Sequence, residues 1–557
     1  MNYTLRNLLA ALCLSALLVG CGGSSDDIFV SNTQPSTPSD EERINQAMID
    51  DPATAIGLIP FDHLDPLRPA PPGNQTTTTL PVADLENNYE TFFGSLSNDL
   101  GVTLQSPENV AKIAFIKSRP ETGNFDLDAK PILNNPLGIP SVSFQQVDYS
   151  TTVSLPEGDQ TFQVSGGLLI PDGIDKSQLK GVIVYFHGTT FRNTLVGSNL
   201  DNPETQLCAQ VFASQGYVVL IPDYVGQGVD WQSVHPYVLY PTVSAQTAVD
   251  MLAAVKPTLR SRFNLTVLDP PLKLFSTGYS EGGAYSLWFN SYLNTDPSKL
   301  DSLYLLTHSV GMEGAYSTSQ AIYNYLFDDV SKDDGNPFDI QNVTLVNIVK
   351  PALAADAFLS YATYSLNSDF AAVFNLDFFQ MKATPPVPQE ACNVDGQQVT
   401  IASAFARPDT DISSQVVASA LGKTANRNRY PGPLQILSSS NNNIQPLVSS
   451  AILQPQPLAD LRQALEAADV DLSPCPDGAV SIVTLAQDSV VVPGNFDILS
   501  ARFPTKLRKT IKIDQTQILW LSSFSDVLGR PYWIPIDHPQ APIFEFLYTL
   551  NIFNELS

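Results

Sequence analysis

The chain has 557 residues, a formal net charge of −27 and 43% hydrophobic residues. A chain of this length and apolar content can bury a large core, and it is longer than one plain catalytic domain. Its acidic balance opposes binding to a nucleic acid, so we predict no such partner, because this binding needs a basic surface that neutralises phosphates.

Residues 1–20 carry the features of an export signal. Arg6 gives a positive start, and the apolar run over residues 8–19 is too short to span a bilayer as a helix. Small residues and Cys21 then follow, which resembles the lipobox of bacterial lipoproteins, where the cysteine becomes the lipidated N-terminus. We expect a lipoprotein signal peptide over 1–20 and a lipid anchor on Cys21, at the outer membrane or surface of a bacterial envelope. An ordinary signal peptide is the alternative.

The next two segments separate this anchor from the core. Residues 21–45 are rich in Ser, Thr, Pro and Asp, a composition typical of a flexible tether. Residues 46–145 contain a few apolar patches and many prolines, and we interpret them as an N-terminal extension without an independent function.

Two apolar runs then predict a parallel pair of buried strands. Residues 181–186 are uninterruptedly apolar and end in His187-Gly188-Thr189, and residues 216–221 repeat the pattern. Residues 202–214 between them have the apolar periodicity of a helix. Strand, helix and strand in this order predict a parallel pair with a right-handed crossover.

The segment Gly278-Tyr279-Ser280-Glu281-Gly282 is the most informative motif. An apolar run over 273–277 predicts a strand before it, and an apolar helix start follows it. A tight strand-to-helix turn needs glycine on both sides of the serine, where a Cβ would collide with neighbouring backbone. Such a turn exposes the serine hydroxyl to a substrate. An ordinary glycine-rich turn is the alternative.

These motifs together resemble the α/β-hydrolase superfamily, and more narrowly bacterial secretory lipases and esterases. The resemblance rests on the HG loop at 187–188, the PDY loop from Pro222, the HPY segment at 235–237 and the GYSxGG elbow. It implies an α/β fold: a mostly parallel sheet with helices on both faces. The core would comprise residues 146–316 and 477–557, with a lid or cap insertion at 317–476.

A catalytic serine needs a base, and the resemblance implies the chain order serine, acid, histidine. Of the five histidines, only His308 and His538 follow Ser280. His538 lies on a predicted loop before an apolar helix, where the family places its base. His308 lies in a predicted strand that precedes every candidate acid, which favours a role in the core.

The acid is expected shortly after the penultimate core strand, which the sequence predicts at 479–485. Asp488 follows that strand and has a Val-Pro pair a few residues on, as in related hydrolases. Asp497 and Asp526 are alternatives. Asp537 adjoins His538, and because adjacent side chains diverge it is poorly placed to orient that ring.

The resemblance also implies two backbone N–H donors for a developing oxyanion. One is the N–H of Glu281, directly after the serine. The other comes from the loop after residues 181–186, where Thr189 is the expected donor.

The insertion leaves the family pattern. Its helix-like and Phe-rich stretches, at 351–359 and 369–381, predict a lid suited to an apolar acyl chain, with a plain packing subdomain as the alternative. Cys392 and Cys475 form a candidate disulfide, because an exported protein meets oxidising conditions. Cys208 is expected to be a buried thiol. The acidic stretch at 328–335 has its glycine misplaced for a calcium loop, and we predict neither a metal nor a cofactor.

The sequence thus predicts a lipid-anchored serine hydrolase of carboxylic esters, acting on small-molecule or lipid esters through an acyl-enzyme. A serine peptidase or acyltransferase on the same fold is an alternative. A catalytically silent surface lipoprotein used for binding is another. The oligomeric state stays open.

Overall fold

The computed structural model describes part of the chain. The described residues are 77–85, 135, 137–156, 158–190, 196–200, 202–230, 233–323, 353–354, 356–367, 369–373, 391–394, 397–400, 448–486, 488, 490–491, 494–513, 538 and 541–557. The predicted signal peptide, Cys21, the tether, the acidic stretch at 328–335, Asp526 and Asp537 lie outside them. Within the described part, no helix combines the length and apolarity needed to cross a bilayer.

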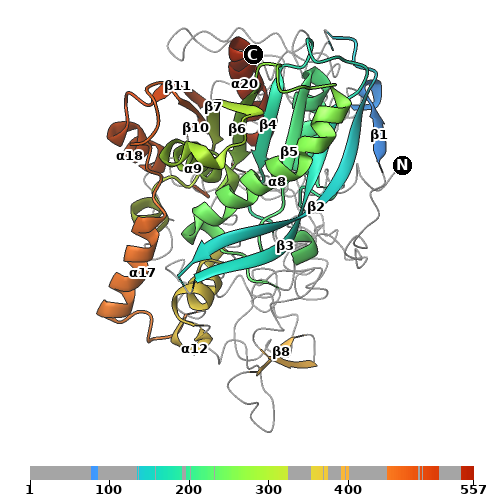
Figure 1. Cartoon of the computed structure of the whole chain (residues 1–557). Helices are drawn as coiled ribbons and strands as arrows, with labels where there is room; N and C mark the ends of the chain where they lie inside the picture. The colour runs from blue at the N-terminus through green and yellow to red at the C-terminus, as the bar shows by residue number, and fades with distance from the viewer. Residues whose placement is uncertain are drawn as a thin grey trace, which may run out of the picture.

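A mixed, mostly parallel sheet forms the centre of the molecule (Figure 1). In the described residues it has nine strands in the order β1-β2-β3-β5-β4-β6-β7-β10-β11. Neighbours from β5 to β11 run parallel, and the pairs on the β1 side run antiparallel. The strands are β1 (Thr78–Pro81), β2 (Ser141–Leu155), β3 (Gly158–Pro171), β4 (Gly181–Phe186), β5 (Tyr217–Pro222), β6 (Leu272–Tyr279), β7 (Tyr304–Met312), β10 (Val480–Leu485) and β11 (Leu507–Ile513).

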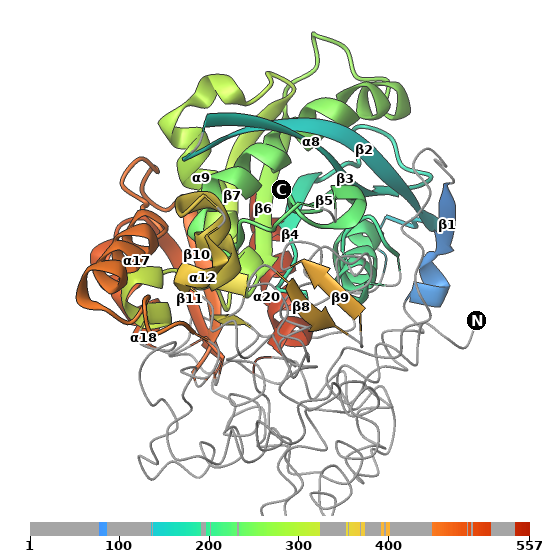
Figure 2. The ribbon, with the colours of Figure 1, turned by 90° about the horizontal axis from the view of Figure 1, so that it is seen from below.

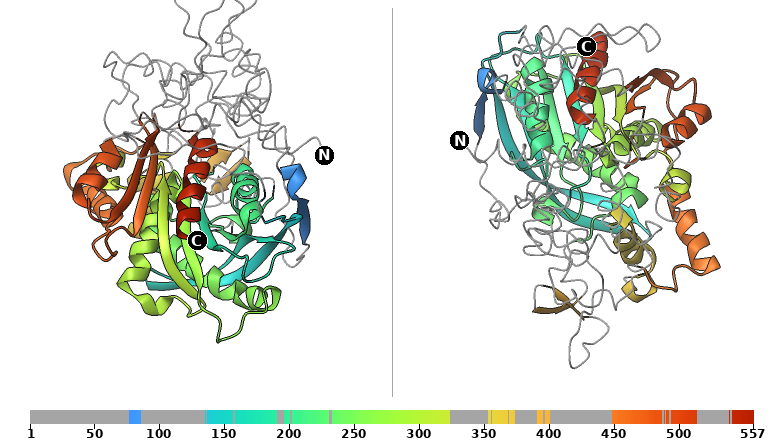
Figure 3. Two further views of the ribbon diagram at one scale, coloured as in Figure 1. Left: turned by 90° about the horizontal axis from the view of Figure 1, so that it is seen from above. Right: turned by 180° about the vertical axis from the view of Figure 1, so that it is seen from behind.

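Helices cover both faces of this sheet, because side chains that alternate along β4 pack against helices on opposite faces. Val182 and Val184 pack in one apolar cluster with α8 (Pro241–Arg262) and α9 (Glu281–Thr295). Ile183 and Tyr185 point to the opposite face. There they pack with α20 (Ala541–Leu556) and with the helical stretch that begins as α7 (Pro203–Leu207). The two views of Figure 3 show α20 on one side of the sheet and α8 with α9 on the other.

This architecture confirms the predicted fold class. Parallel strands with helices on both faces, and a serine turn between β6 and α9, make up the α/β-hydrolase fold. The predicted crossover between β4 and β5 is present, with its helix over residues 203–215. That helix begins at Asn202, whose side chain accepts a hydrogen bond from Glu204 N–H, and Pro203 occupies its first turn.

The sheet extends beyond the boundary predicted for the core. β2 begins at Ser141, before residue 146, and runs in register with β3 for 14 residue pairs, from Val142 to Leu155. β1 belongs to the predicted extension and pairs with β2 at the edge of the sheet. The extension therefore contributes one edge strand, which the short, threonine-rich run at 77–81 did not predict.

Parts of the predicted insertion form elements of their own. They are α12 (Phe370–Val373), the hairpin of β8 (Ala391–Val394) and β9 (Gln397–Thr400), and α17 (Pro455–Ala467). α12 and β8 lie at the lower end of the molecule in Figure 1, and Figure 2 looks onto that end.

The predicted disulfide between Cys392 and Cys475 is wrong. Cys475 is a free thiol, buried in an apolar cluster with Val480 and Leu499. Burial raises the pKa of this thiol to about 12. The segment before β10 packs against the core, whereas Cys392 belongs to the separate β8–β9 hairpin. Cys208 is a free, buried thiol, as the sequence predicts.

Candidate active site

The serine turn brings three backbone segments into close contact. Ser280 joins β6 to α9 with a φ of 55°, a strained conformation for a residue with a side chain. A Cβ at Gly282 would lie 2.0 Å from the carbonyl oxygen of Phe186, and one at Gly278 would lie 2.3 Å from that of Gly282. Only glycine fits at either position, so the two glycines allow the turn to press against the end of β4.

Ser280, His538 and Asp488 form one hydrogen-bonded chain, although they come from three separate parts of the sequence. His538 Nε2 lies 2.8 Å from Ser280 Oγ, and His538 Nδ1 lies 2.5 Å from Asp488 Oδ2. The Tyr279 hydroxyl donates to the carbonyl oxygen of His538 and so holds the backbone of that residue. All three members are largely buried, with exposed fractions of 9%, 7% and 7%.

The environment of Asp488 favours its carboxylate form. Its Oδ1 accepts hydrogen bonds from the N–H groups of Val490 and Val491, at 2.7 and 2.8 Å. Burial opposes ionisation, but the charge of His538 and these hydrogen bonds hold the pKa of Asp488 below its usual value. An ionised Asp488 can orient the imidazole and stabilise its positive charge.

The alternative base and acid lie elsewhere. His308 Nε2 is 2.8 Å from Ser481 Oγ inside the core, where burial lowers the pKa of the imidazole to about 3. Asp497 lies on α18 (Gly494–Arg502) with 64% of its side chain exposed, facing Lys512. Neither contacts Ser280.

The two expected oxyanion donors border the serine. Glu281 is the first residue of α9, so its N–H has no acceptor within the helix. Among the described residues nothing accepts a hydrogen bond from Thr189 N–H. The N-terminus of α9 also favours negative charge at this point through the helix dipole.

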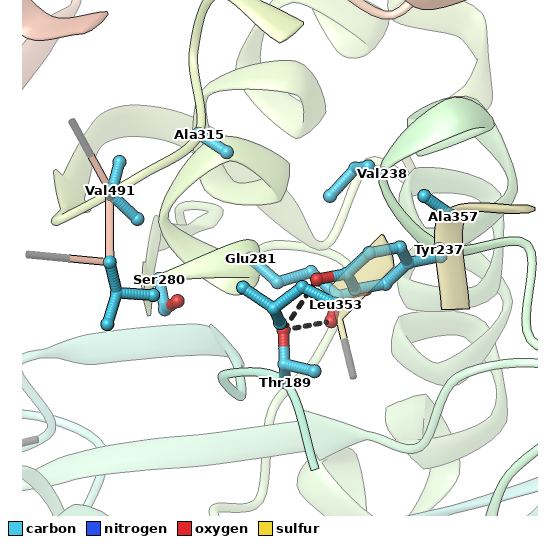
Figure 4. A pocket seen from close by; sticks show the side chains of 10 residues that line it. Thr189, Tyr237, Val238, Ser280, Glu281, Ala315, Leu353, Ala357 and Val491 are labelled. Atoms are coloured by element: carbon cyan, nitrogen blue, oxygen red, sulfur yellow. Dashed lines mark hydrogen bonds between the residues drawn. The ribbon is translucent and has the colours of Figure 1, made fainter. Parts of the chain in front are cut away.

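A buried network that the sequence analysis missed connects these donors. The Glu281 carboxylate accepts hydrogen bonds from the Thr189 hydroxyl at 3.0 Å and the Tyr285 hydroxyl at 2.6 Å, and His235 Nε2 lies 2.6 Å from it. Figure 4 shows Thr189 between Glu281 and Tyr237. The network ties the loop after β4 to the start of α9. Glu281 lies in the GYSxGG elbow and His235 in the HPY segment, so their places in these two motifs were the one sequence signal that could have pointed to the network.

A second carboxyl, on the half-buried Glu204, holds the same loop. Its oxygens lie 3.2 and 3.0 Å from Gly188 N, and the Tyr185 hydroxyl donates to it at 2.5 Å. Burial raises the pKa of Glu204 to about 7. Nothing in the local sequence distinguishes Glu204 from a surface residue at a helix start, so only the fold reveals this contact.

A small apolar pocket opens beside Ser280 (Figure 4). Its volume is about 30 Å³, room for roughly two water-sized groups. His538 is not among the described residues that line it. The lining residues are Thr189, Tyr237, Val238, Ser280, Glu281, Ala315, Leu353, Ala357, Val490 and Val491.

The arrangement does not resemble a metal centre. Donor atoms of Glu313, Asp488 and His538 lie within 4.8 Å of one another. Both ring nitrogens of His538 are already directed at Asp488 and Ser280. A cation bound to His538 would therefore break the hydrogen-bonded chain of Ser280, His538 and Asp488, which we call the relay.

Comparisons with known proteins found only distant structural similarity. No protein-family model matches the chain, and no curated protein matches its sequence. A protein named as a hydrolase from Legionella pneumophila is 17% identical with a TM-score of 0.48, covering 81% of this chain and 95% of its own. The rice cell wall degrading esterase LipA from Xanthomonas oryzae is 16% identical with a TM-score of 0.48, covering 75% and 92%.

Candida antarctica lipase A is more distant, at 14% identity and a TM-score of 0.39, covering 69% of this chain and 73% of its own. These solved structures are thus named as a hydrolase, an esterase and a lipase. Sequence identities this low do not establish a shared activity.

Replacing Gly282 with alanine should prevent the serine turn from forming, because the added Cβ would lie 2.0 Å from the backbone oxygen of Phe186. We expect little soluble protein, or a melting temperature lowered by many degrees. Alanine at Gly494, where a Cβ meets nothing within 4 Å, is the matched control. Thermal melts of both variants test this, and a G282A protein as stable as G494A would contradict the geometry.

Proposed function

We propose that the protein is a serine hydrolase of carboxylic esters that acts through an acyl-enzyme. The observation that carries this proposal is the hydrogen-bonded chain from Ser280 through His538 to Asp488, with a strained turn presenting the serine. A serine hydroxyl is a weak nucleophile unless a neighbouring base takes its proton, and the contact of His538 Nε2 with Ser280 Oγ at 2.8 Å supports His538 as this base.

In acylation, Ser280 Oγ attacks the ester carbonyl carbon and its proton passes to His538 Nε2. The negative charge that develops on the carbonyl oxygen is stabilised by the N–H groups of Glu281 and Thr189. Collapse of the tetrahedral intermediate breaks the bond to the alcohol oxygen, which takes the proton from His538. Asp488 keeps the imidazole in the required tautomer and offsets its transient charge.

In deacylation, water takes the place of the alcohol. His538 removes a proton from the water as it attacks the acyl carbon, and returns that proton to Ser280 Oγ as the acid departs. Each step uses the same two donors, so one geometry serves both halves of the reaction.

The pocket beside Ser280 supports a short acyl group as the preferred substrate. Its walls include both residues that supply the oxyanion donors, and not His538, which has to reach the leaving alcohol. The pocket is therefore on the acyl side of a bound ester. Its volume of about 30 Å³ fits an acyl chain of a few carbons better than a fatty acyl chain.

Lipid anchoring through Cys21 completes the proposal. Its support is the sequence alone: a positive start, a short apolar run and a cysteine after small residues. An enzyme anchored in this way would meet its esters in the bacterial envelope or outside the cell.

Ser280→Ala and His538→Ala should each lower kcat by several powers of ten while leaving the fold intact, because the serine turn depends on its glycines. The double variant should be no worse than either single one, since the relay acts as a unit. Steady-state kinetics on an activated ester measure this, with His308→Ala as the histidine control. Near-normal turnover in the serine variant would remove the proposal.

Leu353→Ala should widen the acyl pocket and shift preference toward longer acyl chains. Ala357→Leu should fill the pocket and restrict the enzyme to the shortest esters. We expect ratios of kcat/KM between four-carbon and two-carbon esters to change about tenfold in opposite directions, as one or two methylene groups allow. Leu458→Ala on α17, away from the pocket, is the control. Unchanged ratios in both pocket variants would place the acyl group elsewhere.

Cys21→Ser should yield protein that no longer partitions with membranes, because thioether lipidation requires the thiol. Buried acyl chains contribute about 0.8 kcal/mol per CH₂ to membrane binding. Fractionation of cells that express either form checks this, with an envelope protein anchored by a transmembrane helix as control. Tight membrane binding of the serine variant would argue against the lipid anchor.

A further inference from the structure

Three carboxyl groups meet at the buried end of the relay. Glu313 follows β7, Asp488 follows β10, and Glu545 lies on α20. Their exposed fractions are 2%, 7% and 0%. A Glu313 carboxylate oxygen lies within 4.8 Å of donor atoms of both Asp488 and His538. The mechanism above uses only Asp488 and leaves the other two carboxyls without a role.

These carboxyls do not share the available hydrogen-bond donors equally. Asp488 receives Val490 N–H, Val491 N–H and the imidazole. Glu545 receives no N–H or hydroxyl donor among the described residues, and its hydrogen-bond contact is with the Glu313 carboxyl. An ionised carboxylate without donors is strongly disfavoured in a dry interior, and adjacent like charges add to this cost. The donor distribution therefore favours the negative charge on Asp488 over Glu545.

Glu313 is held in place from several sides. Its carboxyl accepts hydrogen bonds from Leu485 N–H and from the Thr484 hydroxyl, both at the end of β10. Its own N–H donates to the carbonyl oxygen of Val483 at 3.2 Å, and the preceding Met312 accepts from Ser280 N–H at 2.9 Å.

Its backbone also adopts a left-handed φ of 46°, which a side chain tolerates only where the surroundings enforce it. Glu313 thus sits at the junction between the serine turn and the strand that carries the acid.

We propose that Glu313 is a positioning residue of the relay: as a neutral carboxylic acid it donates a hydrogen bond to Asp488 and holds that carboxylate toward His538 Nδ1. This role rests on the proposed function, since Asp488 matters only if His538 is a base. Glu313 itself touches neither Ser280 nor the substrate position described above. It acts through Asp488.

The electrostatic surroundings agree with a neutral Glu313. Burial, followed by the charges of Glu545 and Asp488, raises the pKa of Glu313 well above its usual value. Burial likewise raises the pKa of Glu545. The pKa of Asp488 is lowered instead, because the charge of His538 and hydrogen bonds that include Glu313 outweigh the effect of burial.

The other titratable groups that face this cluster bring no competing cation. Tyr279 from β6 and Tyr316 after β7 both have their pKa raised well above the usual value, burial being the largest cause. His538, from the residues before α20, is the one basic group in the described part of the cluster, and it is committed to Asp488.

A buried, neutral Glu313 should make the stability of the protein depend on pH. A carboxyl whose pKa is higher in the folded than in the unfolded protein leaves stability intact below its unfolded pKa, and reduces it progressively as pH rises above that value. Glu313→Gln removes this loss. The melting temperature of Glu313→Gln relative to wild type should therefore be higher at about pH 8 than at about pH 4.

The test compares Glu313→Gln, which keeps a neutral donor, with Glu313→Ala, which keeps none. Glu466→Gln on α17, whose side chain is 60% exposed, is the control. At about pH 8 the infrared band of protonated carboxylic acids should be present in wild type and reduced in Glu313→Gln, but not in Glu466→Gln. On an activated ester, Glu313→Gln should keep kcat within about threefold, and folded Glu313→Ala should lose about 10- to 100-fold with little change in KM. The low-field proton signal of His538 Nδ1–H should persist in the glutamine variant and shift in the alanine variant.

Three results would overturn the proposal. An infrared band that Glu313→Gln leaves unchanged would mean that Glu313 is ionised. Equal loss of kcat in both variants would mean that an amide cannot replace the acid, and unchanged kcat in both would deny any positioning role. If Glu313→Ala does not fold, the infrared band and the pH-dependent melting of Glu313→Gln still show whether Glu313 is neutral. If wild type hydrolyses no ester, the proposed function fails, while these two readouts still report on Glu313.

Discussion

The close contact between the serine turn and the end of β4 is the constraint on which the rest of the site depends. Gly282 lies so near the backbone of Phe186 that no side chain fits there. This contact puts the first N–H of α9 beside the loop that carries Thr189. It also fixes Ser280 in its strained conformation, facing His538. One backbone approach therefore positions the proposed nucleophile and both proposed oxyanion donors.

More carboxyl groups lie around this contact than the proposed chemistry needs. Glu204 and Glu281 hold the loop that carries Thr189, and Glu313 and Glu545 lie near Asp488. Each buried charge has to be paired or neutralised. Glu281 is satisfied by His235 and two hydroxyls, and Asp488 by His538 and two N–H groups. Glu313 and Glu545 have no imidazole partner of their own among the described residues, and neutrality is the state we propose for both.

The sheet core and the serine turn could be predicted from the sequence because both leave local signals. Uninterrupted apolar runs, as in β4, mark strands covered on both faces, and the glycines around Ser280 mark a turn that tolerates no Cβ. Asp488 and His538 were located by chain order, which the resemblance supplied. The structure brings these residues into hydrogen-bond contact, and their catalytic role is the proposal above.

Features that depend on tertiary contact were not predicted. Glu545 is one of two acids in the mostly apolar α20, and the sequence gives no hint that it lies near Asp488 and Glu313. The pairing of Cys392 with Cys475 failed because spacing does not reveal that Cys475 packs against β10. β1 escaped notice because a strand of four residues, three of them exposed, has little apolar pattern.

The most direct test of the central claim is to trap the covalent intermediate. A slowly deacylating activated ester is mixed with the wild-type protein, the reaction is quenched in acid during turnover, and the digested protein is analysed by mass spectrometry. The account predicts a burst of released alcohol equal to the enzyme concentration, and one acyl group, on the peptide that contains Ser280. Turnover without a covalent adduct, or an adduct on a different residue, would contradict it.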